Sequence, residues 1–216
     1  MSKKESIKRL VLCIVSFLIL AVGVAFTKVS GLGVSPISSF PNVLSIGLPF
    51  MTIGNWTIIY YLFMILAQYL MLRKDFKIFQ LLQIPFSFLF GFSTDLSVWL
   101  LSHIAPDSYI MQLVFTFIGI AILGFGIMLA VSANVIMNSP EATVQAISIK
   151  TGKEFGTIKT IFDISCVTAA IIISFILCGK LVGIREGTII SAICVGFAVK
   201  LSNKLFKAKV MNFLTK

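Results

Sequence analysis

Charged side chains are scarce in this chain of 216 residues, and acidic ones are the scarcest: only 12% of the residues are charged, with eight carboxylates against eighteen lysines and arginines. A soluble globular domain has about 25% charged and roughly 45–50% apolar residues, whereas 58% of this chain is hydrophobic. The net charge of +10 would suit nucleic acid if the basic side chains formed a surface patch. They lie instead at the ends of apolar segments, which argues against a nucleic-acid partner and indicates membrane topology and attraction to anionic lipid.

Histidine and cysteine are also few, with one histidine and four cysteines. The cysteines lie singly within apolar segments and form neither a CxxC pair nor a cluster with His103. This spacing argues against a disulfide framework and against a metal site. No combination of residues supports hydrolysis, group transfer or redox chemistry. We therefore expect no enzyme, no catalytic residue, no metal and no cofactor.

Long apolar runs are what the chain has in abundance. A membrane-crossing helix needs about 20 mostly apolar residues, and six segments qualify. Their predicted bounds are Leu10–Lys28, Trp56–Leu72, Ile78–Leu101 with a kink at Pro85, Tyr109–Ala133, Ile158–Cys178 and Gly187–Leu205. The basic start lacks a small-x-small cleavage site and is interpreted as the beginning of an uncleaved first span. The predicted fold class is all-α, a polytopic membrane protein with one membrane domain over residues 1–216.

The orientation follows from lysine and arginine in the short loops, which favour the cytoplasmic side. With the N-terminus inside, the inner loops and the C-terminal tail receive nearly all of the basic residues. The outer loops receive only Lys180 and Arg185. Trp56, Trp99 and Tyr109 then fall at outer ends of spans, as an aromatic belt requires. Both termini are predicted to be cytoplasmic.

Two Ser-Pro pairs interrupt this pattern of spans. Ser35-Pro36 and Ser139-Pro140 each follow a glycine-containing apolar segment. Serine before proline favours a helix start, because serine can cap the first N–H groups and proline at the first helical position loses no hydrogen bond. Lipid tolerates irregular backbone only where protein buries it or where it lines a cavity. Each pair therefore predicts a short broken or re-entrant helix next to a binding site.

The two halves of the chain also resemble each other. Phe90-Gly-Phe-Ser-Thr-Asp-Leu96 aligns with Val195-Gly-Phe-Ala-Val-Lys-Leu201, and Gly54-Asn-Trp-Thr-Ile-Ile with Gly156-Thr-Ile-Lys-Thr-Ile. We interpret residues 1–102 and 103–216 as two repeats of helix, Ser-Pro element, helix, helix. A unit with three spans inserts its second copy upside down, which gives the inverted repeats of many secondary transporters and channels.

The sequence Gly31-Leu-Gly with Pro36 after the first span, together with the six-helix length, resembles the YczE/YyaS/YitT-like family of bacterial integral membrane proteins. The resemblance extends loosely over the whole chain. Its members often carry proline and tryptophan directly after the glycines, where this chain has Val34-Ser35 before Pro36. It implies a place in the bacterial cytoplasmic membrane and a presumed transporter, without naming a substrate.

The predicted substrate site joins the two Ser-Pro elements near mid-membrane. Each short helix would direct its N-terminus, with roughly half a positive charge, toward the site, and glycine would let the backbone approach a ligand closely. The residues assigned to it are Gly31, Gly33, Ser35, Pro36, Asn134, Asn138, Ser139, Pro140 and Glu141. Glu141 has an alternative role, because a carboxylate in a first helical turn stabilises the helix by itself.

Two carboxylates inside spans, Asp163 and Asp95, are candidates for a coupling ion. An ionisable group within a membrane span costs several kcal/mol unless it is paired or hydrated. The alternatives are a buried pair or a water-facing group for Asp163, and reach toward the outer surface for Asp95.

These features favour a small secondary transporter or permease for a small organic or anionic solute. One alternative is the substrate-binding membrane subunit of a multi-component, ECF-type vitamin importer, which would require a partner ATPase complex. The other is a non-transporting membrane protein. The expected partners are a small-molecule substrate and membrane lipid.

Overall fold

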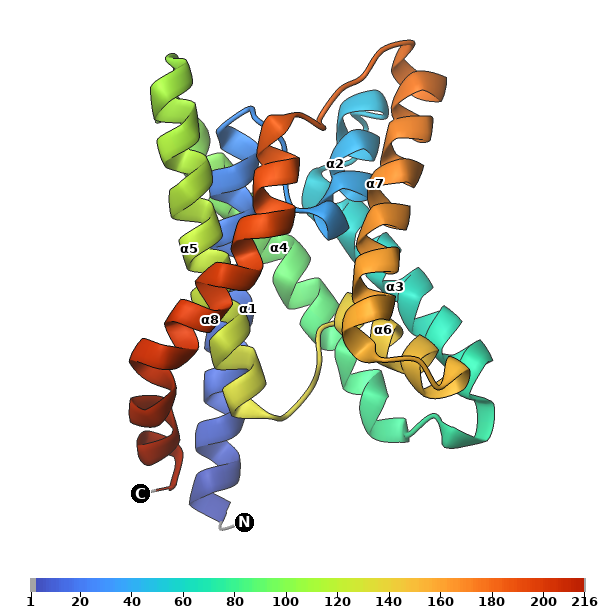
Figure 1. The fold of residues 1–216 in the computed structure, drawn as a ribbon, viewed down its shortest axis with the longest axis vertical. Helices are drawn as coiled ribbons and strands as arrows, with labels where there is room; N and C mark the ends of the chain where they lie inside the picture. The colour runs from blue at the N-terminus through green and yellow to red at the C-terminus, as the bar shows by residue number, and fades with distance from the viewer. Residues whose placement is uncertain (1–2, 216) are drawn as a thin grey trace.

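In a computed structural model, which describes residues 3–215, the chain is all-helical (Figure 1). The α-helices are α1 (Lys3–Val29), α2 (Pro36–Gly47), α3 (Ile53–Leu72), α4 (Gln83–Ser102), α5 (Tyr109–Ala133), α6 (Ser139–Thr151), α7 (Phe155–Cys178) and α8 (Glu186–Thr215). Two short 3-10 helices, η1 (Arg73–Asp75) and η2 (Ile78–Leu82), connect α3 to α4.

Six of these helices are long and apolar enough to cross a membrane: α1, α3, α4 with the 3-10 turn before it, α5, α7 and α8. The prediction of a multi-pass membrane protein is confirmed at this level. The predicted span Tyr109–Ala133 coincides with α5. Pro85 lies in the first turn of α4, where the candidate span Ile78–Ser102 changes from the 3-10 helix η2 to the α-helix. Helix α8 continues beyond the predicted end at Leu205 to Thr215.

Helices α2 and α6 are the two short ones, and each follows a loop that turns back into the molecule. In Figure 1 both helices begin near the middle of the long axis and run toward opposite ends. Both begin at a Ser-Pro pair, with Pro36 and Pro140 in the first turn, as predicted.

The predicted cap of α6 is wrong, and that of α2 is correct in position only. Ser139 is the first residue of α6, and its cap is Asn138, whose side chain accepts a hydrogen bond from the backbone nitrogen of Ser139. Ser35 is the N-cap residue of α2, as predicted, but its hydroxyl donates to Oγ of Ser38 at 3.1 Å and makes no capping bond to an N–H group.

The packing of the long helices centres on α1 and α5, which lie side by side through the molecule (Figure 1). Glycines allow this close approach. A Cβ atom on Gly119 would lie 2.9 Å from the carbonyl oxygen of Gly23, and one on Gly23 would lie 2.8 Å from the Leu123 side chain. Helix α4 packs on α1, and α8 packs on α5.

The short helices pack mainly across the two halves of the chain. Helix α2 lies against α7 and α6 lies against α3, in addition to the contacts α2 makes with α3 and α6 with α7. Both chain termini lie at one end of the molecule (Figure 1), which we call the termini end. Helix α2 runs toward the opposite end, and α6 runs toward the termini end.

Candidate functional site

The first turn of α6 is the centre of the candidate site. Its N-terminus is capped by Asn138, Pro140 lacks an N–H group to satisfy, and Glu141 is the third helical residue. A carboxylate at this position is favourable with the positive end of the helix dipole. The first turn of α6 therefore already holds an acidic side chain of its own and is not an empty anion site.

Glu141 is also placed to hold a proton. Its Oε2 atom is buried and has no hydrogen-bond partner among the described residues. Burial raises the pKa of Glu141; the Lys159 ammonium opposes this effect, and the Asp163 carboxylate adds to it. A carboxyl group in such surroundings exchanges its proton closer to neutral pH than an exposed glutamate.

An ion pair on α7 faces the same region. Lys159 and Asp163 are one helical turn apart and are joined by a short hydrogen bond. The Asp163 side chain is only 26% exposed. One turn beyond, the Sγ of Cys166 lies 3.2 Å from the hydroxyl of Tyr60 on α3. Asp163 is thus paired with Lys159, whereas the Oε2 atom of Glu141 has no hydrogen-bond partner among the described residues.

Two neighbouring tyrosines of α3 connect the beginnings of α6 and α2. Nδ2 of Asn138 donates to the hydroxyl of Tyr61 at 3.4 Å. The ring of Tyr60 lies 6.3 Å from that of Tyr61 and stacks on Phe40 of α2 at 5.2 Å. Ile37, in the first turn of α2, packs against the core cluster that contains Tyr61. The starts of the two short helices are therefore linked through one pair of aromatic side chains.

A pair of buried glutamines holds α6 in place. Gln68 of α3 and Gln83 of α4 exchange two hydrogen bonds, of 3.1 and 3.0 Å. Gln68 also donates to the carbonyl oxygen of Ser139 at 3.1 Å and to Oγ1 of Thr143 at 3.0 Å. Because buried amides are costly when unpaired, this network fixes the first turns of α6 against two spanning helices.

The predicted site residues before α2 lie against the beginning of α8. Gly31 and Gly33 have φ of 75° and 101°, which side chains rarely adopt. The carbonyl oxygen of Gly31 accepts a hydrogen bond from Arg185 at 3.3 Å. A Cβ atom on Gly33 would collide with Oγ1 of Thr188. These glycines bring two parts of the chain together, which differs from the predicted role of exposing backbone to a ligand.

Two other predicted residues have structural positions. Asn134 is exposed, and its left-handed conformation ends α5. Asp95 lies on α4 and accepts hydrogen bonds from the backbone nitrogen of Gly54, at 2.8 Å, and from the hydroxyl of Thr52. It therefore stabilises the N-terminus of α3, and the structure gives it partners that a free coupling site would lack.

A lysine lies close to the C-terminal half of α2. Nζ of Lys28 donates to Oδ1 of Asn42 at 2.8 Å and to Oγ of Ser45 at 3.2 Å. Asn42 in turn donates to the carbonyl oxygen of Gly183 at 2.9 Å. Lys28 thus ties α1 to α2 through neutral oxygens, and no carboxylate forms an ion pair with it among residues 3–215.

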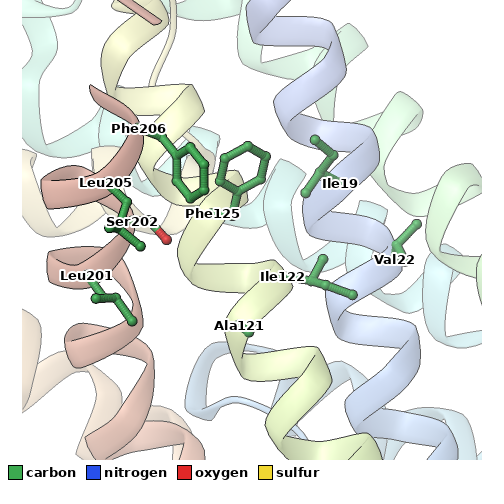
Figure 2. Close-up of a pocket in the computed structure, with 9 residues that line it drawn as sticks. All are labelled: Ile19, Val22, Ala121, Ile122, Phe125, Leu201, Ser202, Leu205 and Phe206. Carbon is green, nitrogen blue, oxygen red and sulfur yellow. The ribbon is translucent and has the colours of Figure 1, made fainter. Parts of the chain in front are cut away.

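An apolar groove lies apart from these polar groups, between α1, α5 and α8 (Figure 2). Its volume is about 600 Å³, and its lining includes Ile19, Ile122, Phe125 and Leu205. In Figure 2 the rings of Phe125 and Phe206 lie next to each other, in an edge-to-face contact with centroids 5.4 Å apart. None of the predicted site residues lines this groove. Its composition suits the hydrocarbon of lipid rather than a polar solute.

Sequence reasoning missed Tyr61 and Gln68. The signal for Gln68 was present, because an amide inside an apolar span is expected to find a polar partner. Nothing in the sequence indicated which partner, since Thr143 is far away along the chain. Tyr61 gave no signal, because the sequence alone does not show which partner a tyrosine hydroxyl inside a span will meet. Lys159 lies in the predicted span Ile158–Cys178 four residues before Asp163, but the pair was not singled out.

The chain belongs to a family described as "Family of unknown function (DUF6198)", whose sequence pattern matches residues 7–204. No curated protein and no solved structure shows significant similarity to it. The resemblance to the YczE/YyaS/YitT-like proteins finds no support in these comparisons and stays a prediction.

Proposed function

We propose that this member of the family is a small secondary transporter for a small organic or anionic solute, coupled to protons through the carboxylates near the start of α6. The observation that carries the proposal is Glu141, a carboxyl group with a buried, unpartnered oxygen in the first turn of a short helix that begins mid-molecule. Ionisable groups kept within a membrane domain mark ion or substrate pathways.

The proposal includes two inverted repeats, α1–α4 and α5–α8. The contacts between helices support it, because most pairs of packed helices have a counterpart when each helix is replaced by the corresponding helix of the other half. The pair α1–α4 corresponds to α5–α8, α2–α7 to α6–α3, and α2–α3 to α6–α7. Helices α2 and α6 begin mid-molecule and run in opposite directions (Figure 1), as an axis in the membrane plane requires.

In this arrangement the residues have separate tasks. Glu141 takes up and releases the proton, and the Lys159–Asp163 pair sets the local potential that the proton meets. Tyr61 and Asn138 offer a hydroxyl and an amide to the solute. An anionic group on the solute would favour the start of α2, whose first turn contains no acidic residue, over the start of α6, which already holds Glu141.

The orientation proposed is termini on the cytoplasmic side of the bacterial cytoplasmic membrane. The basic residues support it, because they gather at the connection between α3 and α4 and around α6, as well as near both chain ends. The site around Glu141 would then be reached from the cytoplasm along α6 and α7.

The test is uptake into proteoliposomes containing the purified full chain, with an imposed pH gradient and a panel of small organic acids, amines and neutral solutes. We expect uptake of at least one solute class that depends on the pH gradient and is lost in Glu141→Gln. The matched control is Asp107→Asn, which removes a carboxylate from the exposed loop before α5 and should transport like the unmodified chain. Absence of uptake across the panel and at every pH would contradict the proposal. Specific solute binding without uptake would favour a binding subunit that needs an ATPase complex.

A further inference from the structure

The two halves of the molecule differ at one pair of helices. In the first half, α3 and α4 pack closely, and glycines stand at the contact. A Cβ atom on Gly91 would lie 2.7 Å from the carbonyl oxygen of Gly54 and 2.5 Å from Ile58, and one on Gly54 would collide with the Gly91 carbonyl oxygen. In the second half, α7 and α8 make no comparable contact among the described residues, although the three pairs of corresponding contacts named above are kept. Figure 1 shows these two helices apart.

The glycines of the close contact have counterparts on the separated helices. The sequence alignment of the halves pairs Gly54 with Gly156 on α7 and Gly91 with Gly196 on α8. A Cβ atom on Gly196 would meet no atom within 4 Å, and one on Gly156 would meet only the neighbouring Glu154 side chain, at 3.9 Å. Glycine weakens a helix unless a close approach requires it. No such approach exists at these two positions in this structure.

The same alignment pairs the polar groups at the contact. Asp95 of α4 accepts hydrogen bonds from Thr52 and Gly54 at the start of α3. Lys200 of α8 stands where Asp95 stands, and Glu154, the residue before α7, stands where Thr52 stands. The second half thus places opposite charges at positions that are hydrogen-bonded to each other in the first half.

These two charges are not paired here. Glu154 and Lys200 are exposed and form no ion pair among residues 3–215. The Lys200 ammonium lies beside the ring of Phe197, 5.8 Å from its centroid. The connection between α7 and α8, including Gly179 and Gly183 with positive φ, is at the end opposite the termini, so closure at the termini end leaves it in place.

We infer that α7 and α8 have a second arrangement, in which they pack through Gly156 and Gly196 and in which Glu154 pairs with Lys200. The inference rests on the proposed inverted repeat. In that arrangement the first turns of α7 move against α8 and cover the Lys159–Asp163 side of the site from the termini end. The present structure is then the conformer open at that end, while the α3–α4 contact with Asp95 closes the opposite end. Substrate and proton then reach Glu141 from the termini end, past the first turns of α7.

Cysteine cross-linking in membranes tests this arrangement without relying on transport. The four native cysteines are replaced by serine or alanine, and Glu154→Cys is combined with Lys200→Cys. Oxidation with copper phenanthroline should link the two positions. The matched control combines Ile176→Cys, near the other end of α7, with Lys200→Cys. Its yield should be at least several-fold lower.

A glycine variant separates closure from folding. Gly196→Leu meets no atom within 4 Å in the present conformer, so the chain should fold and insert normally. It should nevertheless reduce the 154–200 cross-link several-fold, because leucine prevents the close contact. Spin labels at 154 and 200 in the same chain should give two distance populations, and Gly196→Leu should remove the shorter one.

A 154–200 yield no higher than that of the 176–200 control, or a yield unchanged by Gly196→Leu, would overturn the inference. A single long distance between the spin labels would do the same. These outcomes do not depend on flux, so they are distinct from failure of the proposed transport activity. A chain that shows both arrangements but transports no solute would establish the second arrangement and contradict the proposed transport function.

Discussion

The hydroxyl of Tyr61 accepts a hydrogen bond from Asn138 at 3.4 Å, which joins a spanning helix to the cap of a short helix that begins inside the molecule. Asn138 uses its other polar atom, Oδ1, to accept from the backbone of Ser139. One side chain therefore both starts α6 and ties it to α3. The Glu141 carboxyl group follows three residues later, so its position depends on this double use of Asn138.

Glu141→Gln should stabilise the fold increasingly as the pH rises. Burial raises the pKa of Glu141, so the folded chain keeps its proton at pH values where the unfolded chain has lost it. The free energy of unfolding therefore falls as the pH increases through that window, and glutamine removes this loss. Melting temperatures of the two proteins in detergent, measured from pH 4 to pH 9, should diverge toward high pH. Parallel curves would show that Glu141 is not held protonated.

Gln68→Leu should destabilise the protein by about 1–2 kcal/mol, because the Gln83 side chain loses its partner. The Ser139 carbonyl oxygen and the Thr143 hydroxyl each lose one hydrogen bond but keep the bond between them. Removing one partner of a buried polar pair leaves the other unsatisfied. The double variant Gln68→Leu with Gln83→Leu should recover part of the loss. Unfolding midpoints in denaturing detergent measure this. A double variant as unstable as the sum of the single ones would contradict the network.

Gly23→Leu should cost about 1–3 kcal/mol through overpacking, since a Cβ atom there would lie 2.8 Å from Leu123 and 3.0 Å from its backbone nitrogen. Gly196→Leu is the matched control, because that position is open. Thermal unfolding of the two variants should separate them clearly. Equal stability would mean that α1 and α5 do not cross as described.

Asp163→Asn and Asp95→Asn should have different consequences. Asp163→Asn leaves Lys159 without its partner beside Glu141, so proton-dependent uptake should be lost or should lose its pH dependence while the protein still inserts. Asp95→Asn weakens the start of α3 and should cost about 0.5–2 kcal/mol, as other capping losses do, with the pH dependence of uptake unchanged. Uptake assays over a range of pH, with unfolding midpoints beside them, check both. The same pH profile for both variants would remove the special role of Asp163.

The sequence was sufficient for the spans and for the short helices, because both depend on local patterns. The apolar run Tyr109–Ala133 coincides with α5, and the prolines at 36 and 140 mark helix starts. The end of α8 was missed because the prediction followed the apolar run, which stops near Leu205. The helix continues to Thr215, over a basic segment that includes good helix formers such as lysine, leucine and alanine.

The candidate site was predictable only in part. Glu141, Asn138 and Asp163 carry chemistry that a sequence reveals. The sequence does not reveal their partners, because the hydrogen bonds to Tyr61 and Gln68 join residues that only the fold brings together. Serine and asparagine both cap helices well, so the sequence did not distinguish Ser139 from Asn138 as the cap of α6. The helix begins one residue earlier than predicted, which makes Asn138 the cap.

The exchange of short helices between the halves has a consequence for how the protein is assembled. Helix α2 has its largest contact with α7, and α6 has its largest contact with α3. Each half therefore contains a short helix whose main packing partner belongs to the other half. A gene divided in the loop 103–108 would produce two fragments that each insert but remain incomplete. Expressed together, they should associate into one complex, and expressed alone, each should be degraded. The two halves thus behave as one unit of biogenesis, in which the second half to be synthesised completes the first.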